Sequence, residues 1–565
     1  MLFHANFASR RSPVMGRGGM VATSQPLAVA AGLEILARGG NAADAAVATA
    51  AALNVTEPTS TGIGGDCFAL FYDAKTRQIT ALNGSGRAPS ALTLERLRKE
   101  GMTEIPPYHP YTITVPGACA GWCDLIERHG RLPMADILAP AIRLAEEGFP
   151  VAPITSYFWQ RGAERQLKEA FNGLEMTIDG RGPKAGEIFR NPGLARTFKK
   201  VAEGGKPAFY EAEIGEAIAA TIQKASGCMT IEDLAAHTST WDTPISATYG
   251  GLRLWECPPN GQGLAALIAL NILEGFDLPA DPLSADRLHL AIEALRLAFA
   301  DTRWYVSDPG FRNLQTSKPR NQEISESLYH ALLSKGYAAE RRKLIDPQKA
   351  TLDQQRGTPV AASDTVYLTV VDKFGNACSF INSNYMGFGT GILPSGWGFT
   401  LQNRGHNFSL DPAHPNALAP GKRPYHTIIP ALVTREQRVE NSQGQLISTH
   451  QSLFSAFGVM GGFMQPQGHL QIFLSLAEGR DPQSALDLPR FCITDGTSGG
   501  GVALEAGIPA ETVADLTRRG HQVQEVTGWE RVLFGRGQII LRDPESGVLT
   551  GGSDPRADGC AMTLA

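Results

Sequence analysis

The sequence predicts one α/β structure in which helices and strands share a large common core. It has 565 residues, of which 43% are apolar and only 19% charged, so the chain can bury a sizeable core and is not a disordered protein. Helical and strand-like patterns follow each other along the whole chain, and no internal repeat or linker divides it. The 61 glycines predict many tight turns between these elements.

Charge and cysteine content limit the kinds of partner and cofactor that the sequence predicts. The net charge of -5 is small for this length and no Lys/Arg tract occurs, so neither nucleic acid nor an anionic membrane is predicted as partner. A small-molecule substrate is the better prediction. The eight cysteines form no CxxC pair, and Cys119 and Cys123, four apart on a predicted helix, favour core packing over zinc. We expect reduced thiols, no metal and no cofactor.

The N-terminal region carries no convincing export signal. Residues 1–20 contain Arg10, Arg11 and Arg17 but no apolar segment of the kind a signal peptide needs, and the apolar run after them is interrupted by Glu34. The alanine-rich run over 45–55 is too short to span a membrane. These observations predict a cytoplasmic protein.

The first elements are predicted from capping signals. Residues 26–38 form a predicted helix with proline in its first turn, and Gly39-Gly40 ends it. Asn41 is expected to cap a second, alanine-rich helix, with Asp44 near its positive end.

A glycine loop over 56–66 precedes a predicted strand over 67–72. This loop does not match the pattern of a phosphate-binding loop, because no Gly-Lys-Ser/Thr follows and a strand comes next where a helix is required. Further helices are predicted where the block 114–122 opens a helix that runs to His129, over 135–148 and, with an amphipathic pattern, over 289–308.

The second half is expected to be rich in strands. Residues 315–356 carry many charges and glutamines with few β signals, which predicts a helical or mobile segment leading to a cleavage point. A hairpin is predicted near the C-terminus, with strands over 538–542 and 548–551.

A threonine begins the central predicted hairpin. Apolar residues alternate on both sides of a Gly375-Asn376 turn: Val366, Leu368 and Val370, then Ala377 and Ser379. Thr365 stands at the start of the first strand. A threonine hydroxyl becomes nucleophilic when a base lies beside it, and its own α-amine can be that base if the chain is cut between Asp364 and Thr365. The alternative is an ordinary β-branched residue starting a strand.

Four blocks follow Thr365 in order: Tyr385–Gly391 (YMGFGTG), Leu401–Ser409 (LQNRGHNFS), Gly421–Pro430 (GKRPYHTIIP) and Gly458–Gly462 (GVMGG). Together with the hairpin they resemble the γ-glutamyltransferase (γ-glutamyl transpeptidase) family of N-terminal nucleophile (Ntn) hydrolases. The resemblance extends over the chain, through blocks at 82–89, 114–122, 130–134, 208–210, 229–234, 257–263, 289–308 and the Asp-Pro-Arg at 554–556. Family members are made as one inactive chain, cut themselves before a threonine and keep both pieces.

The resemblance implies a four-layer αββα sandwich, with two central, mostly antiparallel sheets between helix layers. It implies a large fragment over 1–364 and a small one over 365–565, which form one structural unit. The two fragments would be each other's partners in a heterodimer, with a dimer of heterodimers as a further option.

The resemblance also implies the catalytic residues. Thr365 would attack a substrate amide through Oγ while its freed α-amine takes the proton, and the same Oγ would attack the Asp364 carbonyl during self-cleavage. The backbone N–H groups of Gly461 and Gly462 match the family's oxyanion pair, although two glycines can also be a plain turn. Ser383 stands where the family has a threonine whose hydroxyl contacts the nucleophile.

The substrate pocket departs from the family pattern. Ser85 occupies the place of the arginine that grips the glutamate α-carboxylate, and Arg87, two residues on, is either its substitute or a surface charge. The remaining pocket positions also differ: Tyr385 replaces an asparagine, Arg404 a glutamine, Asn407 the aspartate for the α-ammonium, and His426-Thr427 a pair of serines.

These changes indicate which acyl group of a substrate the pocket accepts. Losing the aspartate at 407 removes the countercharge for an amino group, and Arg404 adds a cation. A substrate with a carboxylate and no α-ammonium therefore fits these residues better than glutathione, whether Arg87 or Arg404 holds the carboxylate. The segment 410–421 is also shorter than the lid of many transpeptidases. This predicts that water reacts with the acyl-enzyme faster than acceptor amines do.

Three rival interpretations are weaker. Gly496-Thr-Ser-Gly-Gly500 matches the Gly-x-Ser-x-Gly pattern, with His521 downstream, but a strand pattern follows where a nucleophile elbow needs a helix. His406, His414 and His426 fit no metal-ligand spacing. An unprocessed binding protein of the same fold would have no reason to keep Thr365 and its partners.

The predicted activity is that of a self-cleaving γ-glutamyltransferase-like (glutathione hydrolase-like) amidohydrolase. Its acyl-enzyme is released mainly by water, with transfer to amino acids or peptides minor. The alternative is an Ntn amidase for a carboxylate-bearing amide of another kind, oxamate-like or acyl-amide-like.

Overall fold

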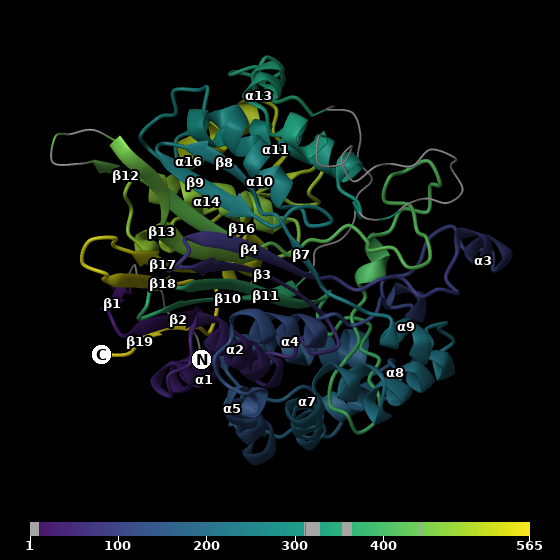
Figure 1. The fold of residues 1–565 in the computed structure, drawn as a ribbon. Coiled ribbons are helices and arrows are strands. Elements are labelled where there is room, and N and C mark those ends of the chain that lie inside the picture. The colour runs from purple at the N-terminus through teal and green to yellow at the C-terminus, as the bar shows by residue number, and fades with distance from the viewer. Residues whose placement is uncertain (1–10, 310, 312–327, 353–363, 441–442, 444–445) are drawn as a thin grey trace.

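The computed structural model describes residues 11–309, 311, 328–352, 364–440, 443 and 446–565. Four layers are stacked in it: helices, a sheet, a second sheet and helices again (Figure 1). The αββα sandwich predicted from the family resemblance is therefore confirmed.

The first sheet contains the Thr365 hairpin, and each neighbouring pair of its strands is antiparallel. Its order is β19 (Cys560–Thr563), β2 (Gly19–Thr23), β10 (Asp364–Asp372), β11 (Ala377–Tyr385), β3 (Asp66–Asp73), β4 (Gln78–Gly84) and β7 (Thr240–Asp242). β10 and β11 form the predicted hairpin and lie in the middle of the sheet.

The second sheet faces the first and is also antiparallel. Its order is β1 (Val14–Gly16), β18 (Leu549–Ser553), β17 (Arg536–Arg542), β13 (Leu446–Met460), β12 (Ala431–Glu440), β9 (Leu252–Glu256) and β8 (Ile245–Tyr249). β17 and β18 confirm the predicted C-terminal hairpin. Apolar side chains of both sheets pack between them, among them Tyr367 and Ile381 against Leu432 and Ala456.

One helix layer covers the outer face of the first sheet (Figure 1). It includes α1 (Pro26–Ala37), α2 (Ala42–Thr56), α4 (Ala118–His129), α5 (Met134–Glu147), α7 (Pro192–Tyr210) and α8 (Glu213–Lys224). Asn41 and Asp44 form a capping box at the start of α2, as the sequence predicted. α2 is buried along its whole length, and its small alanine side chains let neighbouring elements approach on every side.

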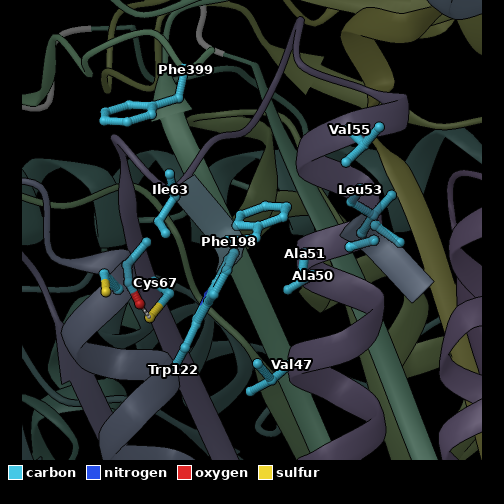
Figure 2. Close-up of a cluster of buried hydrophobic side chains, with 14 of the residues drawn as sticks. Val47, Ala50, Ala51, Leu53, Val55, Ile63, Cys67, Trp122, Phe198 and Phe399 are labelled. Atoms are coloured by element: carbon cyan, nitrogen blue, oxygen red, sulfur yellow. Dashed lines mark hydrogen bonds between the residues drawn. The ribbon is translucent and has the colours of Figure 1, made fainter. Parts of the chain in front are cut away.

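Figure 2 shows part of this core, where Val47 and Leu53 of α2 lie near Trp122 of α4 and Phe198 of α7. All four side chains belong to one buried cluster. Burying side chains of this size contributes roughly 1.5–3 kcal/mol each, so the cluster holds the sheet that carries Thr365 in a fixed position.

The second helix layer consists of α10 (Gly263–Leu273), α11 (Ala285–Tyr305), α14 (Met464–Ala477) and α16 (Ala510–Arg518), with α13 (Lys335–Arg342) on its outside (Figure 1). Further helices are α3 (Leu94–Lys99), α6 (Pro153–Gly162), α9 (Ile231–Ala235) and α15 (Pro482–Asp487), and residues 328–332 are helical as well. Two small sheets complete the described chain: β14 (Phe491–Ile493), β15 (Val502–Glu505) and β16 (Val523–Val526), and β5 (Phe149–Pro150) with β6 (Ile188–Phe189).

The prediction of an amphipathic helix over 289–308 was wrong in one respect. α11 begins earlier, and nearly all its residues from Arg287 to Thr302 are buried, the polar ones included. The polar face is covered because its side chains find partners: His289 Nδ1 lies 2.8 Å from His521 Nε2, and Glu293 accepts a hydrogen bond from Thr351 N. Helical spacing of apolar residues cannot show that the opposite face is also covered.

The segment predicted as a helical or mobile lead-in, 315–356, is described only over 328–352. There it contains α13 and buries Tyr329, Leu332 and Ala338 against α10 and α11. Residues 315–327 and 353–356 lie outside the described residues. All eight cysteines are free thiols, and none of the helices in the described ranges is long and apolar enough to cross a membrane.

Candidate active site

Thr365 lies opposite a β-bulge in β11. Asp364 pairs with Tyr385 and Val366 with Asn382, so Thr365 alone faces two residues of β11, Ser383 and Asn384. The bulge bends β11 and re-aims its side chains, Ser383 among them, next to Thr365. Thr365 is fully buried, and its Oγ lies 3.1 Å from Ser383 Oγ, which is the hydroxyl contact that the resemblance implied.

Ser383 connects the threonine to a buried cation. Its Oγ accepts hydrogen bonds from the Tyr385 backbone N–H at 2.9 Å and from Arg404 Nη2 at 3.1 Å. With these two donors directed at the oxygen, the Ser383 hydroxyl proton points away from them, and Thr365 Oγ is within range to accept it. Ser383 therefore fixes the position of the Thr365 hydroxyl, and its proton is directed at that oxygen.

Arg404 is a fully buried guanidinium in the short 3₁₀ segment Arg404–Asn407. Nη1 donates to Thr427 Oγ1 at 2.7 Å, and the group lies 4.4 Å from the centre of the Tyr385 ring. Among the described residues, Nε has no hydrogen-bond partner and no carboxylate lies within ion-pair distance. Burial lowers the pKa of Arg404 to about 10, so the group stays charged at neutral pH.

Tyr385 has a backbone conformation that is unusual for a residue with a side chain. Its φ is +82°, a left-handed value of the kind that clusters at functional sites. The phenol donates a 2.6 Å hydrogen bond to Asn407 Oδ1, and burial raises the pKa of Tyr385 to about 12, so it stays protonated. Asn407 Nδ2 is buried, and no residue in the described ranges forms a hydrogen bond with it. Tyr385 and Asn407 thus bring neutral polar groups, and no negative charge, to the neighbourhood of Arg404.

Asp66 was not predicted as a site residue. It begins β3 and is the cross-strand partner of Ser383. It is fully buried: Oδ1 accepts from the backbone N–H groups of Gly86 and Gly117 and from Gln402 Nε2, while Oδ2 lies 3.0 Å from His426 Nε2. The signal in the sequence is a carboxylate at the end of the glycine loop 56–66, directly before the predicted apolar strand.

His426 is neutral and has one tautomer. Its Nδ1 accepts from the Ile428 backbone N–H at 3.3 Å, so Nε2 carries the proton and donates it to Asp66. Burial, followed by the nearby charges of Arg404 and Arg423, holds the pKa of His426 well below its ordinary value. His426 therefore ties Asp66 to the segment that carries Thr427.

The two candidate arginines differ in position. Ser85 Oγ accepts from Asn260 Nδ2 at 3.0 Å, and the next residue, Gly86, donates to Asp66. Arg87 points elsewhere, because its Nη1 donates to the Thr238 carbonyl at 3.1 Å and its side chain is partly exposed. Arg404 contacts the residues around Thr365, and Arg87 does not share those contacts.

Gly461 and Gly462 lie between β13 and α14. Both have positive φ, +135° and +60°. The Gly462 carbonyl accepts from Gln262 Nε2 at 2.8 Å, and the same amide donates to the Thr427 carbonyl, so the turn is linked to the residue that holds Arg404. Their N–H groups stand near the positive end of α14, where a developing negative charge is favoured.

Gly461→Ala is expected to lower kcat by about 10- to 1,000-fold with little change in KM. A Cβ at this φ is strained and would lie 3.2 Å from Gly535 Cα. The turn must therefore move, and its N–H groups no longer point at the developing negative charge. Gly479→Ala is the matched control, since its φ is +83° and open space surrounds it. Steady-state kinetics of both variants test this role. Equal activity of Gly461→Ala and wild type would assign the turn a structural role only.

Comparisons with known proteins match this chain along nearly its whole length. A family model described as gamma-glutamyltranspeptidase matches residues 28–564. The chain belongs to the gamma-glutamyltranspeptidase family. It is 35% identical to the glutathione hydrolase-like YwrD proenzyme of Bacillus subtilis (strain 168), over 98% of this chain and 99% of that protein. It is 32% identical to the oxamate amidohydrolase proenzyme of Klebsiella pneumoniae subsp. pneumoniae, over 96% and 98%.

A solved structure with the same fold is that of cephalosporin acylase from Bacillus halodurans. It matches with a TM-score of 0.87 and 46% identity, and covers 100% of both chains. The family resemblance predicted from the sequence is therefore confirmed, and the chain is an enzyme of a family of hydrolase proenzymes. The names of these relatives cover more than one kind of amide substrate.

The rival sites in this gamma-glutamyltranspeptidase family member are accounted for by other contacts. Ser498 of the Gly-x-Ser-x-Gly segment is buried, its carbonyl accepts from Arg296, and strand β15 follows as predicted. The histidines at 406, 414 and 426 have separate partners: the Ile105 carbonyl, the Asn416 N–H and Asp66.

One group in the described part of the chain has the side-chain types of a metal site. The ligand atoms of His289, Glu293 and His521 lie within 4.8 Å of one another. Contacts within the protein occupy part of this cluster: the two histidines bond each other, and Glu293 pairs with Arg296 at 3.4 Å and accepts from the Thr351 N–H. Among the described residues, Glu293 Oε1 and His521 Nδ1 have no hydrogen-bond partner. The sequence-based prediction that no metal is needed stays a prediction.

Proposed function

We propose that the chain cuts itself between Asp364 and Thr365 and then works as an amidohydrolase. The large fragment would comprise residues 1–364 and the small one residues 365–565, held together as a heterodimer. The bulge opposite Thr365, the contact of Thr365 with Ser383 and the glycine turn at 461–462 support this proposal. Both curated relatives named above are called proenzymes.

In the proposed mechanism, Thr365 Oγ attacks the substrate carbonyl and its free α-amine takes the hydroxyl proton. The tetrahedral oxygen is stabilised by the N–H groups of Gly461 and Gly462. The C–N bond then breaks, the ammonium returns the proton to the leaving amine, and an ester of Thr365 remains. Water then attacks this ester while the α-amine takes a proton from it. The bond between the acyl carbon and Thr365 Oγ breaks, the ammonium returns the proton to Oγ, and the acid is released.

Arg404 carries the proposal for the acyl group. A buried guanidinium with an unpartnered Nε and no ion pair among the described carboxylates suits a substrate carboxylate, which forms charge-assisted bonds to it. Asp66 is already occupied by four donors, and position 407 carries a neutral amide. We therefore propose an amide whose acyl group bears a carboxylate and no ammonium near it.

A γ-glutamyl amide is the second candidate. It carries the same carboxylate, and glutathione hydrolase proenzymes are among the relatives, one of them 30% identical over 97% of this chain. For either substrate, hydrolysis is proposed to exceed transfer. The segment 410–421 is short and folds back on itself, with Lys422 Nζ bonded to the carbonyls of Pro415 and Ala417.

Wild-type protein is tested by intact mass and by a matched pair of anilides. Two fragments are expected, with a junction between Asp364 and Thr365. Glutaryl anilide and γ-glutamyl anilide differ only by the α-ammonium, and we expect kcat/KM to favour the glutaryl compound by about 10- to 100-fold, because an unpaired ammonium loses its hydration. Faster turnover of the γ-glutamyl compound would select the second candidate. One uncut, inactive chain would contradict both and indicate a binding protein.

A further inference from the structure

The mechanism above leaves Asp66 without a role, although it lies one strand away from Ser383 and is fully buried. We propose that Asp66 is a positioning residue of the active site, which sets how strongly Arg404 acts on the substrate carboxylate and on the α-amine of Thr365. The inference rests on the proposed function, since it requires a freed α-amine.

Asp66 supplies negative charge at neutral pH. Burial raises the pKa of Asp66 to about 6, while Arg404, Gln402 and the N–H groups of Gly86 and Gly117 oppose the rise. The nearby charge of Asp66 is also the largest influence that keeps Arg404 protonated. Asp66 therefore compensates the guanidinium through space, and leaves its hydrogen-bonding edge to other partners.

A chain of hydrogen bonds joins Asp66 to Arg404 as well. Asp66 accepts from His426 Nε2, His426 precedes Thr427, and Thr427 Oγ1 accepts from Arg404 Nη1 at 2.7 Å. Gln402, which donates to Asp66 at 2.8 Å, lies two residues before Arg404. Asp66 thus orients both the residue two positions before Arg404 and, through His426, the residue that accepts from its guanidinium.

Removing this charge has two consequences of known sign. The site becomes more positive, so an anionic acyl group binds more tightly relative to a neutral one of the same length. The ammonium form of Thr365 also becomes less favourable, so the α-amine loses its proton at lower pH and the acid limb of kcat/KM moves to lower pH. A carboxylate that only holds loops in place would produce neither effect.

The test uses Asp66→Asn in the processed heterodimer, with fragment masses checked first. kcat/KM for glutaryl anilide and neutral valeryl anilide is measured from pH 5 to 9. We expect the glutaryl-to-valeryl ratio to rise about 3- to 10-fold and the acid limb to move down by about one pH unit. An equal loss for both anilides with an unmoved limb overturns the inference and leaves the proposed function intact.

Glu256→Gln is the matched control, because Glu256 forms another fully buried carboxylate–histidine pair, 2.7 Å from His469. It should change neither the ratio nor the limb. If it changes both as Asp66→Asn does, the effects belong to lost stability and the inference is wrong.

A double variant covers the case in which Asp66→Asn is not cut. Arg404→Gln combined with Asp66→Asn restores local neutrality, so it is expected to be cut where the single variant is not. Where the single variant is cut, adding Asp66→Asn to Arg404→Gln should change the anilide ratio by less than about twofold, since the charge it compensates is gone. A double variant that stays uncut, or that shows the full change in ratio, contradicts the inference.

Discussion

Thr365→Ala is expected to remain one uncut chain of 565 residues without amidase activity. The substitution removes the only oxygen that the proposed mechanism uses for both self-cleavage and substrate attack. A loss of about 10⁴-fold or more in kcat is expected, in line with the removal of other enzymatic nucleophiles. Intact mass spectrometry and anilide turnover on the same sample measure both effects.

Two variants make this result specific. Thr365→Ser keeps the hydroxyl and should still cut itself. Thr369→Ala makes the same change four residues along β10, at another fully buried position, and should be cut and active. Cleavage of Thr365→Ala would assign the nucleophile elsewhere, and an uncut Thr369→Ala would show that strand packing alone explains the loss.

Arg404→Met is expected to lower kcat/KM for glutaryl anilide by about 100- to 1,000-fold, because truncating one partner of a buried charge pair typically costs about 2–5 kcal/mol. Valeryl anilide, which has no carboxylate, should lose less than about tenfold, the part that comes from the bond to Ser383. Kinetics with both anilides separate these contributions. Arg404→Lys keeps the charge without the planar fork and should fall between.

Arg87→Ala is the control for this experiment. Its guanidinium bonds the Thr238 carbonyl at the edge of the protein, so less than about a threefold change is expected. Two results would show that Arg404 does not bind the substrate carboxylate. One is an equal loss for both anilides in Arg404→Met, and the other is a large glutaryl-specific loss in Arg87→Ala.

The local signals in the sequence predicted much of the fold. Alternating apolar residues around Gly375-Asn376 gave the central hairpin, and the Asn41–Asp44 spacing gave the cap of α2. Both depend on residues within a few positions of each other, so pattern alone is sufficient. The layer order of the sandwich came from the family resemblance and could not be worked out from periodicity.

The site was predicted less completely, because its contacts join residues that are far apart in the chain. Asp66 meets His426 across 360 positions, and no local pattern announces such a pair. The bulge opposite Thr365 and the positive φ of Tyr385 are also set by packing between strands. The sequence offered Arg87 and Arg404 as equal candidates, and only their different partners distinguish them.

The strand order has a consequence for the product of self-cleavage. If the chain is cut before Thr365, ladders β19·β2, β2·β10, β11·β3, β1·β18 and β12·β9 each join a strand of one fragment to a strand of the other. The fragments are interleaved within both sheets, so neither fragment can dissociate without breaking strand pairs in both sheets. The nicked protein should therefore melt in a single transition in which both fragments unfold together. Because melting releases two separate chains, its midpoint should fall on dilution, whereas the midpoint of uncut Thr365→Ala should not.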